Sequence, residues 1–237
     1  MTGGGHQAGH DTTHFMEHIL ETALFDLDGT LIDTEGQYTR FWEEVGEELI
    51  PDGRAFAMKV KGRTLKSIFE NFILDPAAQR EVQRRLDLFE AQMDYTPIPG
   101  AMDFLADLRE HHVHMAVVTS SNQQKMRSVR EHMSHMLAFF DRVLTAEDFT
   151  ASKPAPDCYL LGARVFGTPL DRCVVFEDAP NGLRAAMAAG IFTVGLTTGY
   201  PAGVVGELCN HMEPDFLALD YERANRLLDD YNHHIVA

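Results

Sequence analysis

The sequence predicts an α/β protein: a three-layer core built on a parallel sheet, with an all-helical domain inserted into it. From Gly100 onwards, segments with helical periodicity alternate with short apolar segments typical of buried strands. Such alternation indicates βαβ units, whose strands run parallel. One strand stands apart, because residues 37–96 after it show only helical patterns. We therefore expect a Rossmann-like core formed by residues 18–36 and 97–237, with residues 37–96 inserted as a helical cap.

The first strand and the inserted helices follow from the spacing of apolar residues. Residues 1–17 are rich in glycine and polar side chains, so we expect a disordered tail there. The apolar run at 22–25 is typical of a buried strand. Helical periodicity follows at 34–50, at 65–74 and from Pro76 onwards. The Pro97-Ile98-Pro99-Gly100 segment then separates the insert from the rest of the core.

The remainder of the chain supplies the other strands and the helices that connect them. Helices are expected at 101–111, 123–137, 156–166, 181–189 and 220–231. Strands are expected at 113–118, 142–144, 173–176, 192–196 and 216–218. In an open parallel sheet ligands bind beyond the carboxyl ends of the strands, so the residues that follow each strand are the candidates for chemistry.

Composition excludes several classes of partner. The net charge of −16 disfavours nucleic acid, because phosphate contacts need clustered lysine and arginine. A small phosphorylated substrate remains compatible, since a local cation can invert the sign of a site. The sequence has three cysteines without Cys-x-x-Cys spacing, no apolar run near 18 residues and no apolar leader after a basic start. We expect a cytoplasmic protein without a membrane partner, and nothing in the sequence predicts an oligomeric state.

Two aspartates follow the first strand with one residue between them. Asp26 and Asp28 flank Leu27, and Gly29 supplies the backbone freedom that a sharp exit from a strand needs. Aspartate is depleted in strands and is costly to bury without a partner. Two carboxylates at the end of a buried strand therefore need a counter-charge, most simply a divalent cation.

Further polar residues follow the other predicted strands. Thr119 and Ser120 come after one strand, Lys153 precedes the helix at 156–166, and Glu177 and Asp178 come after another strand. Each of these alone has an ordinary structural explanation, as a helix cap, a surface charge or a turn. Their occurrence at successive strand ends indicates one site at the edge of the sheet.

The residue types define the chemistry of this predicted site. Asp26, Glu177 and Asp178 offer hard oxygen ligands suited to Mg²⁺. One carboxylate can attack phosphorus, and a second can protonate the leaving oxygen and later activate water. The Thr119 hydroxyl and the following backbone N–H groups can hold phosphoryl oxygens, while Lys153 neutralises the remaining charge.

These four segments resemble the four motifs of the haloacid dehalogenase-like hydrolase superfamily, over roughly residues 20–237. The resemblance implies that Asp26 is the nucleophile and Asp28 the general acid and base. It also implies that Mg²⁺ is bound by Asp26, the backbone carbonyl of Asp28, Glu177 and Asp178. Thr119, Ser120 and Lys153 would bind the phosphoryl group, and the helical insert would be a mobile cap over the substrate.

Two segments point to one branch of the superfamily. Ser-Lys-Pro-Ala-Pro-Asp at 152–157 and Phe-Glu-Asp-Ala-Pro-Asn-Gly at 176–182 resemble the β-phosphoglucomutase-like branch, which contains sugar-phosphate mutases and phosphatases. Similar mutases carry a histidine where Tyr38 stands here, and a cap-loop arginine where Leu65 stands. A mutase must hold a bisphosphate at both ends, so these departures favour simple hydrolysis. Dehalogenation is disfavoured, because it needs no proton donor such as Asp28.

The sequence therefore predicts a Mg²⁺-dependent phosphatase that acts on a small phosphorylated metabolite, such as a sugar phosphate, through an aspartyl-phosphate intermediate. The expected substrate contacts in and near the cap are Tyr38, Lys61, Gly62, Arg63, Thr64 and Asn122. Three alternatives stay open: a β-phosphoglucomutase-type mutase, an inorganic pyrophosphatase, and a non-catalytic binding protein on the same fold.

Overall fold

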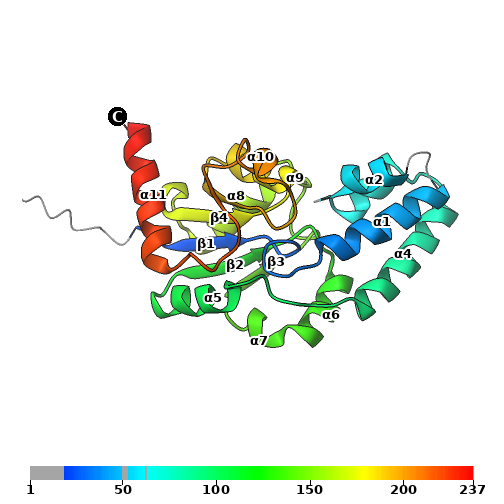
Figure 1. Cartoon of the computed structure of the whole chain (residues 1–237), viewed down its shortest axis with the longest axis horizontal. Helices are drawn as coiled ribbons and strands as arrows, with labels where there is room; N and C mark the ends of the chain where they lie inside the picture. The colour runs from blue at the N-terminus through cyan, green and yellow to red at the C-terminus, as the bar shows by residue number, and fades with distance from the viewer. Residues whose placement is uncertain (1–18, 50–52, 62, 237) are drawn as a thin grey trace, which may run out of the picture.

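A parallel sheet forms the centre of the molecule in the computed structural model, which describes residues 19–49, 53–61 and 63–236 (Figure 1). The tail expected at 1–17 and the predicted contact Gly62 lie outside these residues. The strands of the described chain are β1 (Thr22–Phe25), β2 (His114–Val118), β3 (Arg142–Leu144), β4 (Cys173–Glu177), β5 (Phe192–Leu196) and β6 (His211–Glu213). Their order is β3-β2-β1-β4-β5-β6, and every neighbouring pair is parallel.

The strand order makes β1 the centre of the sheet. The chain runs from β1 outwards through β2 and β3, and then crosses to β4 on the other side of β1. In sheets of this order the reversal opens a crevice at the carboxyl ends of the central strands. Residues that follow β1, β2 and β4 therefore meet at one place.

Helices cover both faces of the sheet, as alternation of side chains along the strands requires. On one face, Ala23 and Phe25 of β1 pack with α5 (Ala101–Glu110), α6 (Gln123–His132), α7 (Ser134–Leu137) and α11 (Tyr221–Val236). On the other face, Leu24 packs with α8 (Asp157–Phe166) and α9 (Pro180–Ala188). The short helices η1 (Leu170–Arg172) and α10 (Ala202–Val205) complete the described core. The predicted three-layer α/β fold is confirmed.

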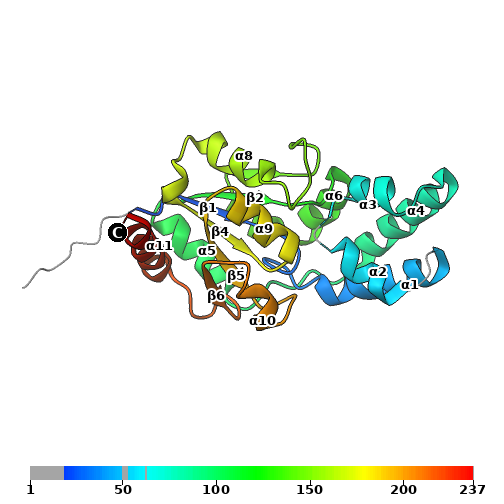
Figure 2. The ribbon, with the colours of Figure 1, turned by 90° about the horizontal axis from the view of Figure 1, so that it is seen from above.

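Four helices lie beyond the carboxyl ends of the strands (Figures 1 and 2). They are α1 (Glu35–Leu49), α2 (Gly53–Val60), α3 (Leu65–Asn71) and α4 (Pro76–Gln92). They pack around a hydrophobic cluster of their own, which includes Phe41, Trp42, Phe56 and Val82. The Asp75 side chain caps the start of α4, where Pro76 occupies the first turn. None of the described helices is long and apolar enough to cross a membrane.

The structure differs from the sequence prediction at several elements, and the helices α2 and α10 were not predicted. The helix expected at 123–137 is divided into α6 and α7, because Met133, with φ −123° and ψ 29°, leaves helical geometry. The strand expected at 216–218 is wrong: the last strand is β6, which pairs with β5. Phe216 instead buries its ring against Phe104, and its backbone N–H donates to the Pro99 carbonyl. The apolar residues at 216–218 therefore reflect the packing of a loop side chain, and they do not pair with a strand of the sheet.

Candidate active site

Asp26 is fixed at the carboxyl end of β1 by the neighbouring strand. Its backbone N–H donates to the Phe176 carbonyl of β4 at 3.1 Å. The chain then turns at Gly29, whose φ of +80° favours glycine. A Cβ atom at Gly29 would lie 2.4 Å from Oδ2 of Asp178, so only a residue without a side chain allows this approach. The turn thereby places the β1 end against the residue that follows β4.

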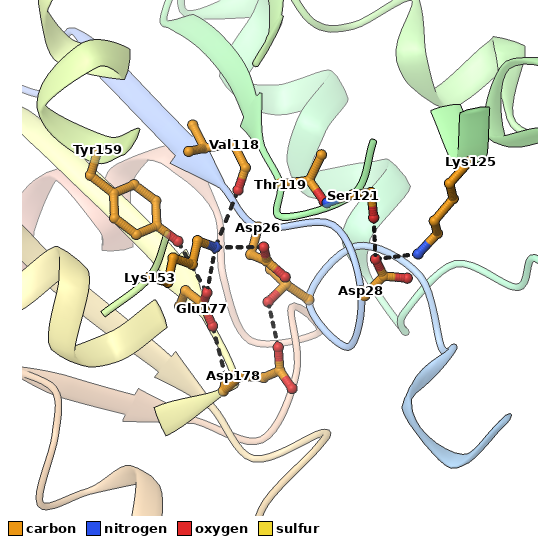
Figure 3. Close-up of polar contacts among 12 residues, drawn as sticks. Asp26, Asp28, Val118, Thr119, Ser121, Lys125, Lys153, Tyr159, Glu177 and Asp178 are labelled. Carbon is orange, nitrogen blue, oxygen red and sulfur yellow. Dashed lines mark hydrogen bonds and ion pairs between the residues drawn. The ribbon is translucent and has the colours of Figure 1, made fainter. Parts of the chain in front are cut away.

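Lys153 joins three of the strand ends through its buried ammonium group (Figure 3). Its Nζ donates to Oδ1 of Asp26 at 2.6 Å, to Oε1 of Glu177 at 2.7 Å and to the Val118 carbonyl at 3.2 Å. Burial alone would lower the pKa of Lys153, but the two carboxylates raise it well above its usual value. The group is therefore a permanent positive charge beside Asp26.

Glu177 is itself held rigidly. Its Oε1 also accepts from the Tyr159 hydroxyl at 3.2 Å, and its Oε2 accepts from the backbone N–H of Ala179 at 2.8 Å. A Cβ atom at Gly182 would lie 1.5 Å from Oε1 of Glu177, so the start of α9 must carry glycine at that position. The Glu177 carboxylate thus has a fixed direction toward Lys153.

Asp178 carries a buried oxygen without a partner. Its Oδ1 accepts from the Thr30 hydroxyl at 3.1 Å, while Oδ2 makes no hydrogen bond among the described residues. Asp26, Glu177 and Asp178 each place one oxygen within 4.8 Å of the others. Burial, together with Glu35 and these two carboxylates, raises the pKa of Asp178 well above its usual value. The three carboxylates together carry more negative charge than the single Lys153 ammonium can balance. Their clustered oxygens therefore fit a divalent cation.

Burial and charge also affect Asp26. Burial raises the pKa of Asp26 to about 7, against the opposing effect of Lys153 and with a further increase from Glu177. A second positive charge at the three-carboxylate cluster would reverse this effect and favour the ionised form. The cluster therefore has the composition of a metal-assisted nucleophile site.

Asp28 has different partners from Asp26, although only Leu27 separates them. Its Oδ1 accepts from the Thr34 hydroxyl at 2.6 Å, and its Oδ2 accepts from the Ser121 hydroxyl at 3.0 Å and pairs with the Lys125 ammonium. Figure 3 shows Asp28 directed toward Ser121 and Lys125, on the side opposite the Lys153 cluster. Each of the two aspartates is therefore paired with a different lysine, Asp26 with Lys153 and Asp28 with Lys125.

Lys125 and Ser121 were not predicted from the sequence. Lys125 is buried, with 3% of its side chain exposed, and lies in the first turn of α6. The side chain of Asn122 caps that helix by accepting from the Lys125 backbone N–H at 2.9 Å. A lysine in the first turn of a helix is unfavourable, because its charge meets the positive end of the helix dipole. Such an unfavourable position is a signal that could have identified Lys125 as a functional candidate.

A pocket lies between the four helices and the strand ends. The predicted phosphate-binding residues Thr119 and Ser120 line it together with Asp26 and Asp28. Thr119 is buried, and its hydroxyl accepts from the backbone N–H of Ser121 at 3.0 Å. On the opposite wall the lining includes Tyr38, Trp42, Leu65, Ile68, Leu86 and Glu90. The strand ends and the helical segment thus enclose one common space.

Two of the residues predicted to contact substrate from the cap, Lys61 and Arg63, line the pocket and also bond other groups of the protein. Lys61 lines the pocket but pairs with Glu35 at 2.8 Å, and its Nζ lies 4.6 Å from the Tyr200 ring centroid. Arg63 lines the pocket, and its Nε donates to the Lys59 carbonyl at 3.0 Å.

Thr64 differs from Lys61 and Arg63, because it is not among the described residues that line the pocket. Its hydroxyl caps α3 and bonds to the Ser152 hydroxyl at 2.7 Å. Asn122 lines the pocket, but its side-chain oxygen is already used as the cap of α6.

Glu90 is a further pocket residue that sequence reasoning missed. It lies on α4 with 5% exposure, and its Oε1 accepts from the Tyr38 hydroxyl at 2.8 Å. Burial raises the pKa of Glu90 to about 7, although Lys125 and the Tyr38 hydroxyl lower it. The signal was present in the sequence, because position 90 follows Val82 and Leu86 at helical spacing on the buried face of α4.

Comparison with known proteins defines the family. The model of the haloacid dehalogenase-like hydrolases matches residues 20–190. Validoxylamine A 7'-phosphate phosphatase of Streptomyces hygroscopicus subsp. limoneus is 31% identical over 195 residues, which cover 80% of this chain and 91% of that protein. Hexitol phosphatase A of Escherichia coli (strain K12) is 32% identical over 178 residues, covering 72% of this chain and 80% of that protein.

Solved structures agree with this fold. β-Phosphoglucomutase from Clostridium difficile has a TM-score of 0.74 at 18% identity, covering 90% of this chain and 99% of that one. The chain therefore belongs to the haloacid dehalogenase-like hydrolase family and is an enzyme of the hydrolase class. The resemblance predicted from the sequence is confirmed.

Proposed function

We propose that the protein is a Mg²⁺-dependent phosphatase that hydrolyses a small phosphorylated metabolite, such as a sugar phosphate, through an aspartyl-phosphate on Asp26. The observation that carries this proposal is the asymmetry of the two aspartates. Asp26 contacts Lys153 within a cluster of carboxylates that could hold a metal ion, while Asp28, on the same side of the pocket, has its own hydroxyl and ammonium partners. Two carboxyl groups in unlike environments suit two unlike roles.

In the first step, an Asp26 carboxylate oxygen attacks phosphorus, and the bond between phosphorus and the leaving oxygen breaks. Asp28 donates a proton to that oxygen, so the dephosphorylated product leaves as a neutral hydroxyl compound. Lys153 offsets negative charge beside Asp26, and Thr119 and Ser120 on the pocket wall bind phosphoryl oxygens.

In the second step, Asp28 accepts a proton from a water molecule whose oxygen attacks phosphorus. The bond between Asp26 and phosphorus breaks, and inorganic phosphate is released. Asp26, Glu177, Asp178 and the backbone carbonyl of Asp28 are the proposed Mg²⁺ ligands. When bound, Mg²⁺ supplies positive charge that stabilises the phosphoryl oxygens in both steps.

The helical segment and the relatives support the rest of the proposal. We assign residues 37–96 as a cap that covers the substrate, because α1–α4 form one wall of the pocket. Two relatives with names that describe sugar-like phosphates support a phosphorylated metabolite as substrate.

The unpaired Cys158, Cys173 and Cys209 support a reducing compartment such as the cytoplasm.

A phosphate-release screen over sugar and polyol phosphates tests this function. With Mg²⁺ present, we expect release from at least one compound, and loss of that release on chelation. Asp26→Asn should lower turnover at least about 10⁴-fold, because the nucleophile is removed, whereas the exposed Asp33→Asn in the same loop should leave it unchanged. Conversion of glucose 1-phosphate to glucose 6-phosphate without phosphate release would instead establish the mutase.

The metal ligands can be tested without activity. Mg²⁺ should raise the melting temperature of the wild-type protein, because a ligand that binds the folded state stabilises it. Asp178→Asn should abolish this rise, and in chelator it should be more stable than the wild type, since one uncompensated buried carboxylate is removed. An equal Mg²⁺ response in both proteins contradicts the assigned ligand set.

A further inference from the structure

Apart from Glu35 at the start of α1, the wall of the pocket formed by α1, α3 and α4 is apolar except for one acid and one hydroxyl. Trp42, Leu65, Ile68 and Leu86 line it, together with Glu90 and Tyr38. These residues face Asp28 and the phosphate-binding segment at 119–122 across the pocket. A substrate with its phosphoryl group at Asp26 would therefore extend its other end toward this wall.

We propose that Glu90 is a specificity-determining residue: its carboxyl oxygens accept hydrogen bonds from substrate hydroxyl groups, and the pocket rejects substrates that carry a second anionic group there. The inference rests on the proposed phosphatase function and names the substrate class as monophosphates of neutral, hydroxyl-rich molecules.

A purely structural role does not account for a carboxyl group at this position. The two oxygens of a carboxylate offer about four lone-pair positions, and the Tyr38 hydroxyl occupies one of them. Burying an acid costs free energy that the Tyr38 hydroxyl and the charge of Lys125 offset only in part, while glutamine would bond the same hydroxyl at a lower cost. Donors on a bound molecule can fill the other positions, and sugar and polyol hydroxyls are such donors.

The cations near Glu90 have other partners among the described residues. Lys125 pairs with Asp28, and Lys61 pairs with Glu35. The Arg63 guanidinium bonds the Lys59 carbonyl and lies 5.7 Å from the Phe72 ring centroid. A second phosphate or a carboxylate would meet Glu90 on an otherwise apolar wall. In either protonation state, Glu90 offers oxygen atoms to hydroxyl groups and no positive charge to an anion.

Two matched pairs of probes test the inference in the presence of Mg²⁺. Glucitol 6-phosphate and 6-phosphogluconate share a six-carbon chain and differ in a hydroxymethyl or carboxylate end. Fructose 1-phosphate and fructose 1,6-bisphosphate differ in one phosphate. For the wild type, we expect the higher kcat/KM with the neutral-ended member of a pair. In Glu90→Gln this preference should fall about tenfold, mostly through KM, because a charged acceptor contributes more than a neutral one.

The ratio of two substrates measured on one sample does not depend on the fraction of folded enzyme, so partial unfolding of a variant cannot imitate the effect. Glu81→Gln is the matched control, since Glu81 is an exposed acid on the same helix. It should keep the wild-type ratio. Arg63→Gln is a test of the competing assignment rather than a control, because Arg63 lines the same pocket; if Glu90 sets the preference, this variant should also keep the ratio.

The outcomes separate the inference from the proposed function. An unchanged ratio in Glu90→Gln overturns the inference, as does a wild type that prefers the doubly anionic members or hydrolyses only phosphates outside both pairs. Selective loss of the doubly anionic substrates in Arg63→Gln would overturn it as well and assign Arg63 to a distal anion. If the wild type releases phosphate from no compound in the screen, the proposed function itself fails.

Discussion

The two walls of the pocket are built in different ways. The wall at the strand ends includes Asp26, and the buried Lys153 ammonium joins Asp26 to Glu177 from a separate strand. The wall formed by the helices is mostly apolar, with Tyr38 and Glu90 as a hydrogen-bonded polar pair. The difference teaches that the residues proposed for the reaction are positioned by the sheet, whereas those proposed for substrate selection lie on helix faces that can change without altering the sheet.

Both walls hold an acid whose pKa burial raises to about 7, but the charges that oppose this increase differ. Burial raises the pKa of Asp26, which a lysine in direct contact opposes and Glu177 increases further. Burial also raises the pKa of Glu90, and the nearest opposing charge, Lys125, is paired with Asp28. Variants on the two walls should therefore affect different measurable quantities.

The largest effect on stability is expected at Lys153. Lys153→Met leaves the buried carboxylates of Asp26 and Glu177 without their ammonium partner, so the free energy of unfolding in chelator should fall by about 3–5 kcal/mol. Lys66→Met is the matched variant on the helical wall's outer surface, where 83% of the side chain is exposed, and it should cost less than about 0.5 kcal/mol. Denaturant titration measures both, and equal losses would contradict the distinction.

The next effect concerns the pH dependence of stability at Glu90. The folded-state pKa of about 7 lies above the usual value of 4.5, so the folded protein retains the proton while the unfolded chain loses it. Stability must therefore fall as pH rises from about 4.5 to about 7, by roughly 3 kcal/mol for this group. Glu90→Gln should lack this decline. Parallel stability curves for the two proteins in denaturant titrations across this range would refute the assignment.

The smallest effect is expected for Tyr38→Phe. Loss of the hydroxyl removes one hydrogen bond to Glu90 and should lower stability by about 1 kcal/mol. Because that hydrogen bond lowers the pKa of Glu90, the stability decline should extend to higher pH than in the wild type. Tyr231→Phe, on α11 of the core, serves as the control and should leave the pH range unchanged.

The sequence predicted the sheet-end residues because topology alone brings them together. Asp26, Thr119, Glu177 and Asp178 follow or end apolar strands, and parallel strands end at one edge; Lys153 lies in the loop before α8 that reaches the same edge. No side-chain detail was needed for that step. The resemblance to a known family then supplied roles that the geometry supports.

The residues that sequence reasoning missed depend on how helices pack. Lys125 and Glu90 reach the pocket from α6 and α4, and their direction depends on helix rotation rather than on strand order. In the loop after α2, side chains predicted to contact substrate have partners within the protein, and those substrate contacts stay predictions. Lys61 and Thr64 were predicted to contact substrate, yet they bond Glu35 and Ser152 of neighbouring segments. Spacing along a loop does not fix the direction in which its side chains point.

The covalent role of Asp26 is the central claim, and trapping of its intermediate tests it most directly. Asp28→Asn lacks the proton donor of the first step, so Asp26 should be phosphorylated more slowly, and it also lacks the base that activates water, so the phosphorylated form should persist. Mixing this variant with Mg²⁺ and the most rapidly hydrolysed monophosphate, followed by acid quench and mass spectrometry, should show one added phosphoryl group on the peptide containing Asp26. The Asp26→Asn, Asp28→Asn double variant should show none. A phosphoryl group on another residue, or wild-type turnover by Asp28→Asn, would contradict the account.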